Sequence, residues 1–264
     1  MSSSWFQRDG ENQPQCDARS GTIIHKAIDR EPNRRYASAV DCLEGRFWML
    51  TTQKFAATDL GGELSFFVAQ VPDTLLWDME AFDTAWKLHP DNRPTIRIVG
   101  RRIQIPRWHQ AYGEDYRFSG QVTQAQRIPD HFQPLLEWTQ REIHPSLNGL
   151  LVNWYEGPEH YIGPHHDSTQ NMVADAPIVT ISFGENRKFR LSRGHKDNRV
   201  VQDFEAPNGT VFVLPQATNA VWKHAVPKSV KYTGQRISVT IRGFEMWNRQ
   251  GGSVEPTETA KQQR

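Results

Sequence analysis

The segment NWYEGPEHYIGPHHDST carries the residues of this chain that are best suited to chemistry. Within it His165 and Asp167 are separated by one residue, so on an extended strand both side chains project from the same face. An imidazole beside a carboxylate supplies two of the three ligands of the facial triad that holds non-haem Fe(II). The adjacent His166 is the competing first ligand, although on a strand it would point away from Asp167. The pair predicts a metal site that another part of the chain must complete.

The candidate third ligand is His224. It lies in VWKHAVPK, far downstream of the pair, at the end of a β-rich run and just before Pro227. Each of these residues alone could be an ordinary surface side chain, because a His-x-Asp pair arises often by chance. Together, His165, Asp167 and His224 would leave three of the six positions around an octahedral metal open.

Two arginines lie on one late β-rich run, RISVTIRGF. Arg236 and Arg242 are six residues apart, so on a strand their side chains face the same way, as do those of Ser238 and Thr240. Inward-facing guanidinium groups in an apolar run are costly unless they bind an anion, and the guanidinium fork matches a carboxylate. The alternative is a strand with arginines at its two solvent-exposed ends. The first interpretation predicts a carboxylate pocket beside the metal.

The elements that must position these residues are mostly strands. Short β-rich runs divided by Gly, Pro, Asn or Asp are LSFFVAQV, PTIRIVG, RRIQIP, GLLVNWY, PIVTISFG, KFRLSR, TVFVLP and RISVTIRGF. We expect one helix after Asp73 as N-cap, through TLLWDMEAFDTAWKL, and a second from about Asp130 through HFQPLLEWTQREI, with Pro134 near its first turn. This order predicts an α+β, mainly β, protein built on a double sheet or jelly roll, with two or so supporting helices on one side.

Composition excludes several classes of protein. The 264 residues include 9 Trp, 13 Phe and 6 Tyr, which is enough large apolar surface for a core. No apolar run approaches the roughly 18–20 residues of a membrane span, and the polar start MSSSWFQRDGENQPQ lacks the apolar stretch of a secretion signal. We therefore expect an intracellular monomer of cytoplasm or nucleus, without a membrane partner. Cys16 and Cys42 are the only cysteines, so a disulfide framework is excluded.

The polar ends predict flexible segments, an arm over residues 1–38 and a tail over residues 248–264. Between them no linker is long enough to separate two domains, so residues 39–247 are expected to form one domain.

Two basic clusters are candidate phosphate-binding surfaces on a chain whose net charge is only +1. The first has Arg93, Arg97, Arg101, Arg102 and Arg107 in RPTIRIVGRRIQIPRW. The second has Arg187, Lys188, Arg190, Arg193, Lys196 and Arg199 in RKFRLSRGHKDNR. The alternative is that both are ordinary solvated faces of strands.

Taken in order, N-x-Y, H-x-D, a distant His and R-x5-R resemble the AlkB family of Fe(II)/2-oxoglutarate dioxygenases. The similarity continues through PIVTISFGENRKFR, NGTVFVLP and HAVPK, and back through IPRWHQAYG and YRFSG, covering about residues 92–244. The resemblance implies a double-stranded β-helix with a substrate lid at about residues 92–120 and a catalytic core at about residues 147–244.

The resemblance also implies roles for individual residues. His165, Asp167 and His224 would bind Fe(II), leaving room for 2-oxoglutarate and O2. Arg236 would pair with the distal carboxylate of 2-oxoglutarate, and Arg242 would lie near the carboxylate that chelates iron. Further cosubstrate contacts would come from Asn153, Tyr155 and Ser238. In the lid, the substrate contacts would be Tyr116, Phe118, Ser119 and Arg107, with Phe118 stacking on a flipped base.

The implied activity is oxidative demethylation or dealkylation of N-alkylated bases in DNA or RNA, with release of formaldehyde, succinate and CO2. Val99 stands where duplex-repairing relatives carry a bulky wedge, which favours a single-stranded DNA or RNA substrate. Thr169 stands where the family has a carboxylate that accepts a hydrogen bond from the exocyclic amine of the base.

Three alternatives remain. The same cofactors could serve oxidation of a protein side chain or small metabolite, the scaffold could be a non-catalytic binding module, or the ligands could hold zinc for hydrolysis. A zinc hydrolase would leave the arginine pair unexplained.

Overall fold

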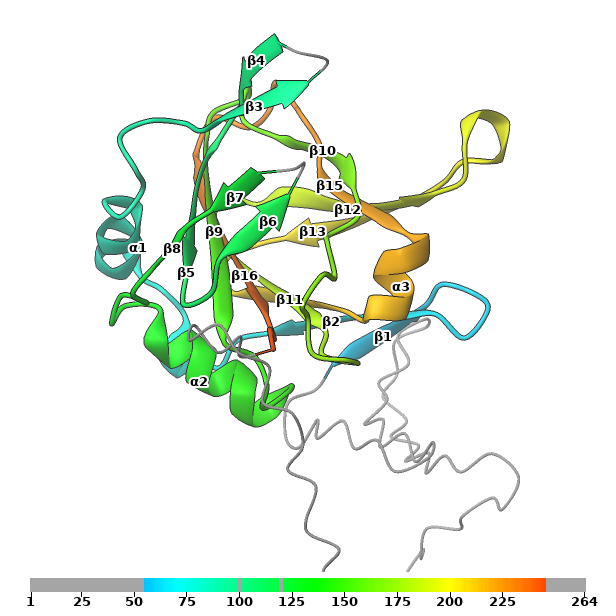
Figure 1. Cartoon of the computed structure of the whole chain (residues 1–264), viewed down its shortest axis with the longest axis horizontal. Helices are drawn as coiled ribbons and strands as arrows, with labels where there is room; N and C mark the ends of the chain where they lie inside the picture. The colour runs from blue at the N-terminus through cyan, green and yellow to red at the C-terminus, as the bar shows by residue number, and fades with distance from the viewer. Residues whose placement is uncertain (1–54, 99–100, 119–120, 246–264) are drawn as a thin grey trace, which may run out of the picture.

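A computed structural model of the chain describes residues 55–98, 101–118 and 121–245 (Figure 1). The predicted arm and tail lie outside these residues. The helices are η1 (Asp73–Leu75), α1 (Met79–Trp86), α2 (Gln133–Glu142), η2 (Lys196–Asn198) and α3 (Gln216–Val221). The strands are β1 (Ala56–Asp59), β2 (Ser65–Gln70), β3 (Thr95–Ile98), β4 (Arg101–Gln104), β5 (Trp108–Tyr112), β6 (Tyr116–Phe118), β7 (Gln121–Thr123), β8 (Ala125–Gln126), β9 (Gly149–Glu156), β10 (Ile162–His165), β11 (Ile178–Gly184), β12 (Arg187–Arg193), β13 (Val200–Ala206), β14 (Thr210–Leu214), β15 (Lys223–Val226) and β16 (Gln235–Arg242).

Two sheets make up the body of the molecule. The larger has eight strands in the order β1-β2-β14-β11-β16-β9-β5-β8, and the smaller has four in the order β10-β15-β12-β13. Neighbouring strands are antiparallel in both, except for the short parallel pair β5 and β8. Two further hairpins, β3–β4 and β6–β7, lie apart from both sheets in the strand pairing.

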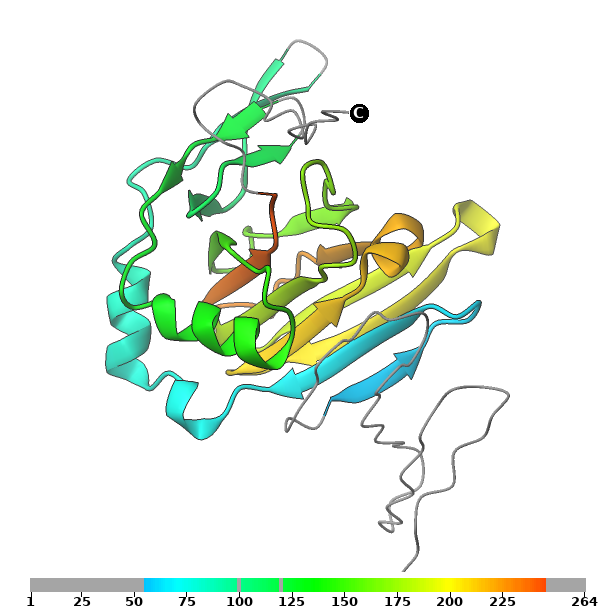
Figure 2. The ribbon, with the colours of Figure 1, turned by 60° about the horizontal axis from the view of Figure 1, so that its bottom comes forward.

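Alternation along the central strands divides the core into two layers. One face of the larger sheet packs its Val and Ile side chains, such as Val179 and Val239, against Leu135 and Trp138 of α2. Figure 2 shows α1 and α2 along this side of the larger sheet. The helices thus cover one face, as predicted from the sequence.

The opposite face of the larger sheet packs against the smaller sheet. Phe66 of β2 and Phe212 of β14 stack at 5.6 Å, and Phe189 of the smaller sheet stacks on Phe212 at 4.5 Å. Trp222 closes the same cluster. Two facing sheets with helices on one side confirm the predicted mainly β fold with a jelly-roll core.

The first helix begins later than predicted. Asp73 starts only the short turn η1, and the N-cap of α1 is Asp78, whose carboxylate accepts a hydrogen bond from the Ala81 N–H at 2.9 Å. Trp77 supplies the reason, because its ring stacks on Phe183 at 3.7 Å and the chain is not helical there. Within the described residues, no helix combines the length and apolar character that crossing a bilayer requires.

Candidate active site

A cavity of about 500 Å3 opens between the two sheets. Its walls include Thr180 of β11 and Tyr155 of β9 on the larger sheet, and Phe189 of β12 on the smaller sheet. Of the residues predicted to form the site, the cavity is lined by His165, Asp167, His224, Arg236, Arg242, Tyr155, Ser238, Tyr116 and Arg107. The fold therefore gathers into one space side chains that the sequence spreads over more than half of the described residues.

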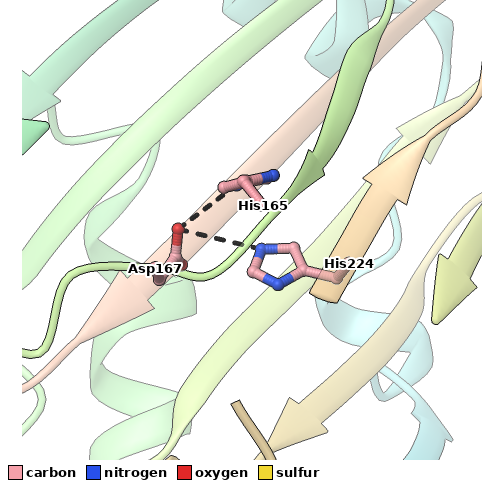
Figure 3. Close-up of side chains that lie close together, drawn as sticks. All are labelled: His165, Asp167 and His224. Atoms are coloured by element: carbon pink, nitrogen blue, oxygen red, sulfur yellow. Dashed lines mark ion pairs between the residues drawn. The ribbon is translucent and has the colours of Figure 1, made fainter. Parts of the chain in front are cut away.

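Three of these side chains converge at the edge of the smaller sheet (Figure 3). His165 ends β10 and is paired in register with His224 of β15, so both imidazoles lie side by side, with ring centroids 4.2 Å apart. The Asp167 Oδ1 atom lies 3.4 Å from His165 Nε2 and 3.7 Å from His224 Nε2. Ligands bound at about 2.0–2.2 Å to one metal stand about 3 Å apart, so a small contraction would close this set around an ion. The two imidazoles and one carboxylate fit Fe(II).

Asn219 of α3 holds the backbone of this ligand segment. Its side chain accepts from the Asp167 N–H and donates to the Asp167 carbonyl, each at 3.0 Å. The His166 ring is bonded instead to the Asn219 main-chain carbonyl. His166 follows the end of β10 and lines the cavity, but it is not part of the His165–Asp167–His224 cluster.

Arg242 donates hydrogen bonds to the second carboxylate oxygen of Asp167. Its Nη2 and Nε atoms both donate to Asp167 Oδ2, the Nε atom at 3.2 Å, and both side chains are almost fully buried. Burial alone would raise the pKa of Asp167, but Arg242 and the two imidazoles hold it well below its usual range. The carboxylate is thus ionised, with Oδ1 left facing the imidazoles. Arg242 thus contacts a metal ligand directly and also lines the cavity, and its place near the iron-chelating carboxylate of the cosubstrate stays a prediction.

Burial and the neighbouring His165 lower the pKa of His224 to about 3. A neutral imidazole keeps a lone pair available, which is the form that binds a metal ion. His224 can therefore coordinate a metal ion at neutral pH without first losing a proton.

Arg236 lies at the other end of the cavity and is 1% exposed. Its Nε donates to Ser182 Oγ at 2.9 Å, and its guanidinium carbon lies 5.0 Å from the centre of the Tyr155 ring. Among the described residues, Nη1 finds no hydrogen-bond partner. Burial lowers the pKa of Arg236, yet an arginine stays charged at neutral pH. A buried cation with an unused donor is the arrangement that an anionic ligand would complete.

Arg107 reaches the cavity from its position just before β5. It is 8% exposed, and its Nε donates to Asn153 Oδ1 at 2.8 Å. Asn153 therefore supports Arg107 from β9 and does not itself line the cavity, while Ser238 faces it from the paired position on β16.

Tyr116 of β6 lies over the metal-ligand cluster. Its hydroxyl donates to Asp167 Oδ1 at 3.3 Å, and Arg242 lies 4.5 Å from the centre of its ring. Burial raises the pKa of Tyr116 to about 12, so the phenol is neutral. Phe118 belongs to the same strand, but its side chain, like Ser119 and Val99, lies outside the described residues.

The predicted basic clusters are only partly surface features. Arg187 is fully buried, and so is most of Arg107, so neither can contact a phosphate backbone. Lys188 and Arg190 both pair with Asp203, at 3.2 and 2.6 Å. Arg187 and Arg107 were therefore wrongly assigned to a phosphate-binding surface, because the sequence does not show that the fold buries them. Lys188 and Arg190 stay partly exposed, so their contact with phosphate stays a prediction. Arg101 and Arg102 of the first cluster are exposed on β4.

Sequence reasoning missed several residues of the site. His109 lines the cavity two positions after Arg107, and Thr180 lines it opposite Thr240 on the neighbouring strand. Ser182 holds Arg236, and Asn219 holds Asp167. The signal was the alternation of hydroxyl and apolar residues in VTIS and ISVT, which places the hydroxyls on the cavity face of two paired strands.

Comparison with known proteins agrees with this geometry. The family described as the 2OG-Fe(II) oxygenase superfamily matches residues 82–242. The chain belongs to that superfamily, whose members use Fe(II), 2-oxoglutarate and O2, as predicted.

Within the superfamily the resemblance to AlkB proteins is confirmed. The chain is 28% identical over 160 residues to the DNA oxidative demethylase ALKBH2 of Bos taurus, covering 56% of each chain. It is 28% identical over 213 residues to the protein of that name from Arabidopsis thaliana, covering 69% of this chain and 66% of the relative. It is 28% identical over 172 residues to the alpha-ketoglutarate-dependent dioxygenase alkB homolog 3 of Bos taurus, covering 61% and 57%. The chain thus spans just over half the length of the cattle relatives.

Proposed function

We propose that this protein is an Fe(II)- and 2-oxoglutarate-dependent dioxygenase that removes alkyl groups from the nitrogen atoms of nucleobases in DNA or RNA. The observation that carries the proposal is the presence, in one cavity, of the His165–Asp167–His224 cluster and of the buried, partly unpaired Arg236. A non-catalytic module would have no need of both.

Each residue has a separate task in this reaction. His165, Asp167 and His224 would hold Fe(II). Together with bound 2-oxoglutarate, this ion would activate O2. Arg236 binds the distal carboxylate of the cosubstrate and Tyr155 packs against that guanidinium. Arg242 keeps Asp167 ionised and in one orientation.

The overall reaction balances as an N-dealkylation. One oxygen atom of O2 enters a C–H bond of the N-methyl group, giving a hydroxymethyl group. The other oxygen atom enters 2-oxoglutarate, which loses CO2 and becomes succinate. The C–N bond of the hydroxymethyl product then breaks, the nitrogen takes up a proton and formaldehyde leaves.

Support for a nucleobase substrate comes from the cavity walls and from the relatives. Ile96, Ile105 and Ile162 line the cavity and offer apolar contact to the ring of a base. Tyr116 lies beside the metal ligands. The β3–β4 hairpin, at the top of the molecule in Figure 1, carries the exposed Arg101 and Arg102, which could contact phosphates. Two relatives are named as DNA demethylases. The small Val99 favours a single-stranded substrate, and we expect the enzyme to act in the cytoplasm or nucleus.

The test is turnover of methylated single- and double-stranded oligonucleotides with Fe(II), 2-oxoglutarate and ascorbate, followed by release of formaldehyde. We expect His165→Ala, Asp167→Ala and His224→Ala each to abolish formaldehyde release, because each removes a ligand. His166→Ala should retain most of it, because that ring bonds to Asn219. Consumption of 2-oxoglutarate without formaldehyde from any oligonucleotide would instead indicate a protein or metabolite substrate.

A further inference from the structure

The cavity contains more positive than negative charge. Three guanidinium groups line it, those of Arg107, Arg236 and Arg242, against one carboxylate, that of Asp167. Burial and the neighbouring Arg107 lower the pKa of His109 to about 3, so this imidazole adds no charge at neutral pH. Fe(II) and the 2-oxoglutarate dianion would cancel each other, so their binding leaves the excess unchanged.

Arg107 is the cation without an ionic partner. Arg242 is paired with Asp167, and Arg236 would be paired with the cosubstrate. Arg107 bonds to the neutral Asn153, and within the described part of the chain no carboxylate lies within ion-pair distance of it. Because Arg107 is 8% exposed, water screens its charge weakly.

The hydrogen-bonding groups near the metal ligands are also unequal. Asp167 is the only carboxylate among the described lining residues, and its Oδ2 is held by Arg242 while Oδ1 faces the metal ligands and Tyr116. Thr169 does not line the cavity and is exposed. Of the other polar groups that line the cavity, Arg107 can only donate hydrogen bonds, whereas the hydroxyl groups of Ser168, Thr180, Ser238 and Thr240 can donate or accept.

We propose that this cavity selects a neutral base whose alkylated nitrogen lies between two carbonyl groups, such as N3-methyluracil or N3-methylthymine, over the cationic N3-methylcytosine and N1-methyladenine. The inference rests on the proposed function and narrows its substrate class. A cationic base would add like charge to a buried site that already holds the unbalanced charge of Arg107, and its amine would gain nothing from a guanidinium, which can only donate hydrogen bonds. A carbonyl-flanked base instead offers acceptors to the donors of Arg107 and Ser168. Arg107 is thus a specificity-determining residue.

The experiment compares two single-stranded oligonucleotides that differ in one base, N3-methyluracil or N3-methylcytosine. These bases are nearly identical in shape and differ in the carbonyl or amine at one ring position and in charge. We expect kcat/KM for formaldehyde release to favour N3-methyluracil by about tenfold or more, equivalent to one misplaced hydrogen bond or charge. Binding of both oligonucleotides to the Mn(II)-loaded protein with 2-oxoglutarate under nitrogen gives the affinity apart from turnover.

Substitution of Arg107 tests the cause. Arg107→Gln removes the charge that no carboxylate balances and should reduce the preference for N3-methyluracil, whereas Arg107→Lys keeps the charge and should retain most of that preference. Equal or better turnover of N3-methylcytosine by the native protein overturns the inference while the proposed function stands. Failure of both bases also overturns the inference, and the proposed function falls with it only if no other methylated oligonucleotide releases formaldehyde while 2-oxoglutarate is consumed.

Discussion

Two buried arginines, Arg187 and Arg236, differ in how their guanidinium groups are hydrogen-bonded. Arg187, at the start of β12, directs Nε to Glu185 at 2.9 Å and Nη1 to the His160 carbonyl at 2.9 Å. Its Nη2 reaches the carbonyls of Gly157 and Gly234, both at 3.0 Å. The guanidinium group therefore ties together the loop after β9, the start of β16 and its own strand.

Arg236, on β16, hydrogen-bonds to Ser182 and Tyr155 but leaves Nη1 without a hydrogen-bond partner among the described residues. Tyr155 lies between the two arginines, 5.6 Å from Arg187 and 5.0 Å from Arg236. Burial alone therefore does not show whether a charged side chain supports the fold or binds a ligand. A guanidinium satisfied by main-chain carbonyls supports the fold, and one with a donor turned to a cavity is suited to a ligand.

The largest effect is expected from Arg187→Met. Removing this guanidinium takes one donor each from the carbonyls of Gly157, His160 and Gly234 and the ion pair from Glu185, which should lower the free energy of unfolding by about 3–5 kcal/mol. Urea denaturation measures it. Arg190→Met, on the same strand but in a partly exposed pair with Asp203, should cost less than about 1 kcal/mol. Normal stability of Arg187→Met with weak cosubstrate binding would reverse the roles given to the two arginines.

The complementary change is Arg236→Ala. Loss of the charged contact to a carboxylate should weaken 2-oxoglutarate binding by about 2–5 kcal/mol, with stability unchanged or higher because an unpaired buried cation is gone. Calorimetric titration of 2-oxoglutarate into the Mn(II)-loaded protein measures it. Arg236→Lys should recover part of the affinity, since an ammonium group keeps the charge but loses the forked geometry. Unchanged affinity in Arg236→Ala would remove the cosubstrate assignment.

The buried His109 differs from both arginines, because an imidazole can lose its proton and so become neutral when it is buried. Its pKa is lowered to about 3, whereas an unfolded chain takes up this proton near pH 6.5. The unfolded state therefore binds more protons between these values, and stability falls as the pH falls, by at most about 1.4 kcal/mol per pH unit for one such group.

His109→Gln should therefore reduce the loss of stability between pH 6.5 and pH 5.5 by about 1 kcal/mol. His224 contributes a similar dependence, so the variant is expected to keep part of the slope. Urea denaturation at the two pH values measures the change. An identical slope in the variant would show that His109 is protonated in the folded protein.

The sequence pointed to the metal-ligand cluster through the spacing of His165 and Asp167, although β10 ends at His165 and Asp167 lies in the loop that Asn219 holds. The alternation that places Arg236 and Arg242 on one face also holds for the hydroxyls between them. Long apolar strands such as β9 and β11 were evident, whereas short ones such as β10 and β15 carry too few residues for a pattern.

Other features depend on contacts between distant segments. Asp78 and not Asp73 caps α1, because Trp77 must reach Phe183. Arg187 reads as one more basic residue in RKFRLSR until the loops that surround it are in place. Asn219 likewise has no local signal for its bonds to Asp167.

The pairing of Arg242 with one oxygen of Asp167 has a consequence for competition among metals. A carboxylate with one oxygen already engaged can give a metal only a single bond, which suits Mg2+ and Ca2+ poorly because they favour sites rich in oxygen. Two imidazoles instead favour the later transition metals, and intrinsic affinity rises from Fe2+ through Co2+ and Ni2+ to Cu2+. Iron therefore occupies such a site through its supply, and protein isolated from nickel- or zinc-rich conditions will carry the wrong ion until a chelator removes it.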